Sequence, residues 1–266
     1  PTLCSGCSPA RRSSSGARDR TPGPLGKGWG APARFDPGAI IALQWQVPVG
    51  DPFDVYVDEI SFVDLSGTGG TGGAMTDSSA LCHGHDSVLV AIDIQGRLAS
   101  AMPAADLEPF MQSTSVLLRA AVHLDIPILA TEQYPQGLGE TLPEIRQHYP
   151  ASARCMAKTG FSCCAADGFN AALQRLGRKQ VILTGMETHV CVLQTALELK
   201  QSGYQVFVAQ DGVCARSRQR TDNALARLRQ AGIIVTHSES VLFEWLRDAQ
   251  HPQFKAVSRL VKELAS

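Results

Sequence analysis

Residues 180–212, QVILTGMETHVCVLQTALELKQSGYQVFVAQDG, decide the fold. An apolar run at 180–187 has the length of a buried strand, and a helical pattern at 190–202 follows it and ends before Gly203. A second apolar run occupies 205–212. Two strands joined by a helix form a parallel pair, which predicts a parallel sheet covered by helices. Cys191 lies close to the start of that helix, either as a packing residue or as a nucleophile.

The same alternation recurs on both sides of this unit. Further buried strands are predicted at 87–94, 126–133 and 233–240. Helices are predicted at 103–124, 167–177 (with Asp167 as N-cap and Gly177 after its end), 219–231 and 240–248. The expected fold class is α/β: a three-layer sandwich with a central parallel sheet over residues 86–266.

The N-terminal third has a different character. Residues 1–32 are rich in Ser, Gly, Pro and Arg and lack apolar periodicity, so disorder is expected. Residues 33–64 contain two strand-like runs, too few for an independent domain. Residues 65–85 form a predicted glycine-rich linker. Met75 stands just ahead of the α/β pattern, which raises the hypothesis that residues 1–74 are upstream sequence joined to a separate protein.

Composition limits the functional classes. The chain has 266 residues and a formal net charge of -1, which gives no electrostatic signature of nucleic acid or of an anionic membrane. We find no apolar run long enough to cross a bilayer. There are eight cysteines, mostly within apolar segments, which favours a reducing, cytoplasmic location. The Cys4-x-x-Cys7 pair has no second pair, so a zinc site there is poorly supported.

Ionisable and polar residues collect where the predicted strands end. In parallel sheets, sites lie beyond the carboxyl ends of the strands. This rule selects Asp93, Gln95, Glu132, Gln133, Tyr134, Lys158, Cys191 and Asp211.

Three of these residues form a set with recognisable chemistry. A helix start and a nearby ammonium group, Lys158, both favour the thiolate of Cys191. A carboxylate, Asp93, can take the thiol proton and later give it to a leaving amine. Local sequence ranks Cys163 and Cys164 below Cys191 only through the helix-start context. From the residues alone, a structural role for Cys191 stays open.

Several motifs together resemble the isochorismatase-like cysteine hydrolase superfamily, and most closely its isochorismatase domain-containing branch. They are VAIDIQGRLA, ATEQYPQGLGETLPEI, AKTGFSCC, LTGMETHVCVLQTALELKQSGYQVFVAQDGVCARS and HPQFKAVSRLVKE, in family order over about residues 86–264. The resemblance implies a catalytic triad of Asp93, Lys158 and Cys191. It also implies a cis peptide at Met186–Glu187 and an oxyanion hole formed by the N–H groups of Glu187 and Cys191. Separately, residues 33–64 resemble the C-terminal end of a jelly-roll carbohydrate-binding module.

Departures from the family pattern narrow the expected chemistry. The segment after the second strand lacks the Asp-x-His element of zinc-binding nicotinamidases, so we expect no catalytic metal and no cofactor. The cysteine favours hydrolysis of a small amide-type C–N substrate. Gln95, Gln133, Tyr134 and Phe161 are candidates for the substrate pocket, with core packing an alternative for Phe161. The unusual METHVC turn keeps a second function open, that of a non-catalytic binding or scaffold protein.

The family resemblance also implies a homo-oligomer. Residues 251–266 carry Phe254, Val257, Leu260, Val261 and Leu264 at helical spacing. This apolar stripe packs either on its own domain or on a partner subunit.

Overall fold

A computed structural model describes residues 80–264 of the chain. The predicted segments 1–32 and 33–64, and residues 65–79 of the predicted linker, lie outside the described residues. Within the described part, no helix is both long and apolar enough to cross a membrane.

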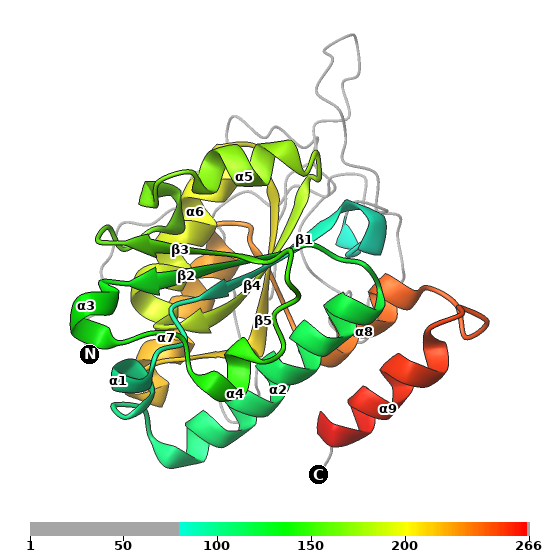
Figure 1. Cartoon of the computed structure of the whole chain (residues 1–266), viewed down its shortest axis with the longest axis horizontal. Helices are drawn as coiled ribbons and strands as arrows, with labels where there is room; N and C mark the ends of the chain where they lie inside the picture. The colour runs from blue at the N-terminus through cyan, green and yellow to red at the C-terminus, as the bar shows by residue number, and fades with distance from the viewer. Residues whose placement is uncertain (1–79, 265–266) are drawn as a thin grey trace, which may run out of the picture. The chain divides into compact units, whose positions relative to one another are not determined.

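The centre of the described part is a parallel six-stranded sheet, which confirms the predicted fold class (Figure 1). The strand order is β3-β2-β1-β4-β5-β6. The strands are β1 (Ser87–Ile92), β2 (Ile128–Gln133), β3 (Arg154–Lys158), β4 (Gln180–Met186), β5 (Gln205–Cys214) and β6 (Ile234–Thr236). The chain builds the sheet outward from β1 to β3 and then returns to the other side of β1 with β4. The strand order therefore reverses between β1 and β4, which is where α/β sheets hold their ligands.

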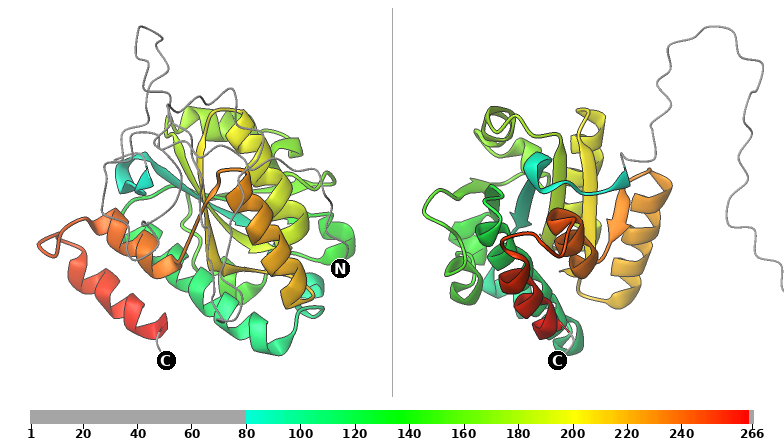
Figure 2. Two further views of the ribbon diagram at one scale, coloured as in Figure 1. Left: turned by 180° about the vertical axis from the view of Figure 1, so that it is seen from behind. Right: turned by 90° about the vertical axis from the view of Figure 1, so that its right-hand side faces the viewer.

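Helices cover both faces of the sheet (Figures 1 and 2). Helices α2 (Ala104–His123), α8 (Ser238–Leu246) and α9 (Phe254–Leu264) share one apolar core, with Phe110, Leu242 and Leu260 buried in it. Helices α5 (Phe169–Arg175), α6 (Leu193–Gln201) and α7 (Arg218–Gln230) contribute to the second core. The short elements are η4 (Gly84–Asp86), α1 (Gly96–Ala99), α3 (Pro135–Leu138), α4 (Pro143–Arg146), η5 (Cys163–Ala165) and the π-helix η6 (Thr188–Val192).

The domain begins earlier than the predicted boundary at residue 86. Cys82, within the predicted linker, is fully buried in the core beside α8. Its sulfur accepts a hydrogen bond from Nε1 of Trp245 at 3.1 Å, and its backbone N–H donates to Glu244 at 2.7 Å. Residues 80–85 are therefore part of the packed domain.

Two local predictions differ from the structure. Asp167 does not cap α5, because Gly168, with φ of 76°, occupies the N-cap position and no side chain supplies a cap. The last strand stops at Thr236, not at residue 240, because α8 begins at Ser238. The carboxylate of Asp211 accepts a hydrogen bond from the backbone N–H of Ser238 at 2.9 Å, satisfying a group left free at the helix start.

The C-terminal apolar stripe packs on its own domain. In α9, Val257 and Leu260 are buried, and Phe254, Val261 and Leu264 lie partly buried against the same core. Near the C-terminal end of α9, Nη1 of Arg119 in α2 forms an ion pair with Oε2 of Glu263 at 2.5 Å. The stripe is thus accounted for without a partner subunit.

Candidate active site

Four side chains converge at the carboxyl ends of neighbouring strands. Asp93 follows β1, Gln133 ends β2, Lys158 ends β3, and Cys191 lies in η6 just after β4. Because all four strands are parallel and adjacent, their carboxyl ends meet at one edge of the sheet. The three residues that the sequence pointed to, Asp93, Lys158 and Cys191, are therefore brought together at the reversal of the strand order.

A fully buried ion pair forms the base of this cluster. Nζ of Lys158 lies 2.6 Å from Oδ2 of Asp93, and both side chains are completely inaccessible. The other carboxylate oxygen, Oδ1, accepts a hydrogen bond from the hydroxyl of Thr131 at 2.8 Å. Asp93 itself has a left-handed backbone conformation with φ of 51°, which aspartate tolerates better than most residues. The pair is thus both geometrically fixed and withdrawn from water.

Gln133 connects this pair to the cysteine. Its Oε1 accepts a hydrogen bond from Nζ of Lys158 at 2.6 Å and lies 4.0 Å from the sulfur of Cys191. Gln95 in turn holds Gln133, because its Nε2 donates to the carbonyl of Gln133 and its Oε1 accepts from the N–H of Gln133. Gln95 is fully buried, and Nε2 also donates to the carbonyl of Gly139. The side chain of Gln95 is therefore occupied in holding the strand end.

The strand-to-helix turn that carries Cys191 is tight. Gly185 has φ of 131°, and a Cβ at this position would lie 2.1 Å from the carbonyl oxygen of Ile92, so only glycine lets β4 approach β1 here. The peptide bond Met186–Glu187 is cis, as the family resemblance implied. The chain then enters η6, not a regular helical turn, and Cys191 is buried with 5% of its surface exposed.

Burial governs the proton affinities of the two central groups. Desolvation raises the pKa of Asp93 above its usual value, although the Lys158 ammonium and hydrogen bonds oppose the change. Desolvation, followed by the Asp93 charge, raises the pKa of the Cys191 thiol, and only Lys158 counters this among the main contributions. For the Cys191 thiol, the pKa-raising effect of burial therefore exceeds the pKa-lowering effect of the nearby ammonium, which the sequence alone had emphasised.

The remaining residues selected from strand ends divide between the site and its surroundings. Tyr134 and Phe161 are half exposed, at 53% and 54%, so Phe161 is not a core residue. Glu132 belongs to another environment, since its carboxylate accepts hydrogen bonds from the N–H and hydroxyl of Thr141 at 2.7 Å. Asp211 lies away from the cluster, where it binds the start of α8.

Other side chains support the site without having been selected from the sequence. Thr131 fixes Asp93, and the period-two pattern of β2, which places Thr131 and Gln133 on one face, was the available signal. Arg216 donates from Nε to the carboxylate of Glu187 at 3.0 Å and anchors the turn before Cys191. Cys163 is fully buried, with its sulfur 3.4 Å from the hydroxyl of Thr131. Among residues 80–264, no three His, Cys, Asp or Glu side chains gather as a metal site would require.

The cluster has the components of nucleophilic catalysis. It contains a thiol, a carboxylate whose raised pKa makes it a stronger base, and an ammonium group that keeps the carboxylate in place. The carboxylate and the thiol are both buried in this cluster, and burial raises the pKa of each.

Comparison with known proteins points to one family. The isochorismatase domain matches residues 87–240 of the chain. Isochorismatase domain-containing protein 2A of Mus musculus is 40% identical over 182 residues, which are 66% of this chain and 83% of the mouse protein. Isochorismatase family protein 1B of Dictyostelium discoideum is 33% identical over 180 residues, 66% of this chain and 86% of its own length.

Solved structures agree with the observed architecture. A Caenorhabditis elegans protein described as MAR1 ribonuclease superimposes with a TM-score of 0.65 at 34% identity, covering 68% of this chain and 92% of its own. The Escherichia coli YcaC gene product, described as an octameric hydrolase of unknown specificity, has a TM-score of 0.63 at 24% identity and covers 69% of this chain and 90% of its own. The second similarity concerns the fold alone.

The buried ion pair yields a prediction about stability. Lys158→Met leaves the Asp93 carboxylate buried without its counter-ion, so the free energy of unfolding at pH 8 should fall by about 3–5 kcal/mol. Without the ammonium group, the pKa of Asp93 rises further above its unfolded value. The contribution of Asp93 to the free energy of unfolding is then present at low pH, where its carboxyl group is protonated, and is lost as pH rises through its pKa in the folded state. Chemical denaturation at pH 5 and pH 8 should show the larger loss at pH 8.

The matched control is the double variant Asp93→Asn/Lys158→Met, which removes both charges. It should be more stable than Lys158→Met alone at pH 8 and should show a weaker dependence on pH between the two conditions. Equal stability of the single and double variants at both pH values would contradict a buried, charged Asp93 paired with Lys158.

Proposed function

The chain belongs to the isochorismatase family, and on this premise we propose that it is a hydrolase that cleaves a small amide-type C–N bond through a thioester on Cys191. The observation that carries the proposal is the convergence of the Cys191 thiol with the buried pair of Asp93 and Lys158 at the reversal of the strand order. In this proposal Asp93 is the general acid and base, Cys191 the nucleophile, and Lys158 the residue that holds both in place.

The proposed reaction begins with the thiol. As the sulfur of Cys191 attacks the substrate carbonyl carbon, its proton passes to Asp93. The negative charge that develops on the carbonyl oxygen is received by the backbone N–H groups of Glu187 and Cys191. Asp93 then returns the proton to the nitrogen, the C–N bond breaks, and the amine leaves a thioester behind. Water, deprotonated by Asp93, attacks the thioester, releases the acid and restores the thiol.

The substrate pocket in this proposal is bounded by Tyr134 and Phe161. Both rings are half exposed and lie next to the cluster in sequence, Tyr134 directly after Gln133 and Phe161 in the loop whose carbonyl accepts from Lys158 at 2.9 Å. Gln133 supplies the polar wall, and Gln95 acts through Gln133. Two flat aromatic walls and one amide fit a compact, largely apolar amide, a class that needs no metal or cofactor in this mechanism.

The first test is turnover by Cys191→Ala against a panel of small amides. We expect activity to fall by about three orders of magnitude or more, since removal of a nucleophile removes the covalent route. Cys164→Ala, at a half-buried neighbouring cysteine, is the matched control and should retain wild-type activity. The melting temperature of each variant checks its fold. Undiminished hydrolysis by Cys191→Ala would sink the mechanism.

A short RNA belongs in the same panel because the nematode relative is described as a ribonuclease. Cleavage of RNA by the wild type in place of every amide would replace the proposed substrate class.

A second function, a non-catalytic scaffold, is favoured by one observation, the 5% exposure of Cys191. The pH dependence of Cys191 alkylation by iodoacetamide, followed by mass spectrometry of its peptide, separates the two. Lys158 lowers and Asp93 raises the pKa of the thiol. Lys158→Met should therefore move the alkylation midpoint to higher pH, and Asp93→Asn should move it to lower pH.

Turnover should respond in a different way. Asp93→Asn should lose hydrolysis although its thiolate is more abundant, because the proton carrier is gone. If Lys158→Met and Asp93→Asn both keep the wild-type pH profile of Cys191 alkylation, and the wild type turns over no substrate, the scaffold function would be favoured.

We also propose that the protein works as a homo-oligomer, in the cytoplasm. The support for the assembly is the family resemblance of the sequence motifs. Because the apolar stripe of α9 is covered by its own domain, we place the interface on other elements. Static light scattering at micromolar concentration should give a mass of more than one subunit, and a mass of a single subunit would refute the assembly.

A further inference from the structure

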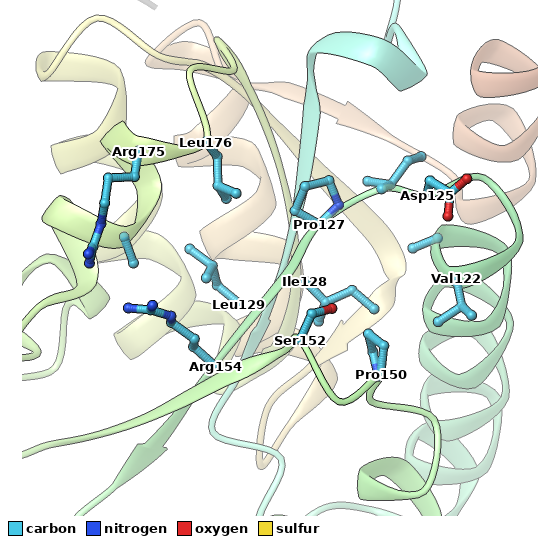
Figure 3. A pocket seen from close by; sticks show the side chains of 13 residues that line it. Val122, Asp125, Pro127, Ile128, Leu129, Pro150, Ser152, Arg154, Arg175 and Leu176 are labelled. Atoms are coloured by element: carbon cyan, nitrogen blue, oxygen red, sulfur yellow. The ribbon is translucent and has the colours of Figure 1, made fainter.

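A second concave site lies at the end of the sheet opposite the strand ends that carry the cysteine cluster. Figure 3 shows the residues that line it. The cavity has a volume of about 420 Å³ and sits where β2 and β3 begin, whereas Gln133 and Lys158 end these same strands. It is lined by Ala121, Val122, Asp125, Ile126, Pro127, Ile128, Leu129, Pro150, Ser152, Arg154, Ala172, Arg175 and Leu176. A volume of this size matches that of pockets for small organic ligands, about 300–1,000 Å³.

The middle of this cavity is apolar. Pro127, Ile128 and Leu129 run along its floor, and Leu176 of the α5 end and Val122 of α2 stand on either side of them (Figure 3). Val122 is 43% exposed, which is unusual for a large aliphatic side chain facing a cavity. Pro127 and Leu176 are partly exposed, whereas Ile128 and Leu129 are only 3% and 4% exposed, so the accessible apolar surface lies on Val122, Pro127 and Leu176.

Two arginines from different elements form one end. Arg154 begins β3 and Arg175 ends α5, and Figure 3 shows both guanidinium groups on the same side of the cavity, directed toward each other. No ion pair within residues 80–264 involves either group. Arg175 uses only Nε, which donates to the carbonyl of Ala171 at 3.1 Å. Both arginines are exposed, and two guanidinium groups on one side of a cavity with no carboxylate paired to either favour an anion that bridges them.

A single carboxylate marks the other end. Asp125 lies across the cavity from the arginines (Figure 3). Asp125 is exposed, and Arg178 donates a hydrogen bond to its backbone carbonyl at 3.5 Å. The cavity thus has two unpaired guanidinium groups at one end, an apolar middle and a carboxylate at the other end.

We propose that this cavity binds a small amphiphilic carboxylate. The carboxylate bridges the guanidinium groups of Arg154 and Arg175, and the hydrocarbon part covers Pro127 and Leu176. The site is separate from the cysteine cluster and does not depend on the reaction proposed for it.

Isothermal titration calorimetry of the full chain with sodium octanoate tests the proposal. Wild type should bind octanoate, and Arg154→Gln/Arg175→Gln should bind it at least about tenfold more weakly, because each arginine contributes a charge-assisted hydrogen bond. Octanol, which has the same chain without the charge, should bind wild type as weakly as octanoate binds the double variant. Raising the salt concentration should weaken octanoate binding more than octanol binding.

Three further variants serve as controls in the same titration. Arg227→Gln removes an exposed arginine of α7 that does not line the cavity, and should bind octanoate like wild type. Asp125→Asn should bind it equally or more tightly, and asparagine also accepts the left-handed backbone at this position, where φ is 52°. Cys191→Ala should bind it like wild type, because the cysteine site is not involved.

Four outcomes would overturn the proposal. They are no heat of octanoate binding to wild type, equal affinity in the double arginine variant, equal affinity for octanol, and loss of binding in Cys191→Ala. The last would place the ligand at the cysteine cluster. None of these outcomes bears on whether Cys191 is a nucleophile, so the two proposals fail independently.

Discussion

A lysine ammonium group buried without contact to water is the constraint on which the site depends. A charge in that position is tolerated only when it is paired and its hydrogen-bond donors are satisfied. Lys158 meets this condition through Asp93, through Gln133 and through the carbonyls of the loop that follows β3. These partners come from three neighbouring strand ends, so the sheet must keep β1, β2 and β3 in register for the charge to persist.

The hydrogen bonds that satisfy Lys158 continue from Gln133 to Gln95 and then to the loop after β2. Gln133 can accept from Lys158 only if its backbone is fixed, and Gln95 fixes it through both ends of its own amide. Gln95 is held in turn by the carbonyl of Gly139, which ties the loop after β2 to the site. The hydrogen bonds that satisfy the buried charge are therefore linked directly to the loop that follows β2.

The sequence was sufficient to predict the fold and to group the residues that meet at the site. It was not sufficient to predict the direction of every strand-end side chain or the burial of Cys191. Hydrophobic periodicity and the alternation of strands with helices predicted a parallel sheet. Because parallel strands end at the same edge of a sheet, Asp93, Lys158 and Cys191 could be grouped. Asp211 met the same strand-end rule and lies elsewhere, because its position within β5 directs it to α8. The direction of the Asp211 side chain depends on the irregular register between β4 and β5, which the amino-acid composition does not reveal. The burial that raises the pKa of Cys191 could not be predicted either, because desolvation depends on packing from distant segments.

The donors of Lys158 also limit what it can do in a reaction. An ammonium group has three N–H bonds, and Nζ lies within hydrogen-bond distance of four acceptors: Asp93, Gln133, Gly160 and Phe161. No donor is left to bind a developing oxyanion unless one of these bonds breaks at a cost in a buried place. In the proposed reaction, the groups that stabilise the oxyanion would therefore come from the backbone of the turn before Cys191, and Lys158 would act by position and charge alone. That role would leave the Asp93 carboxylate as the acceptor of the thiol proton in the proposed mechanism.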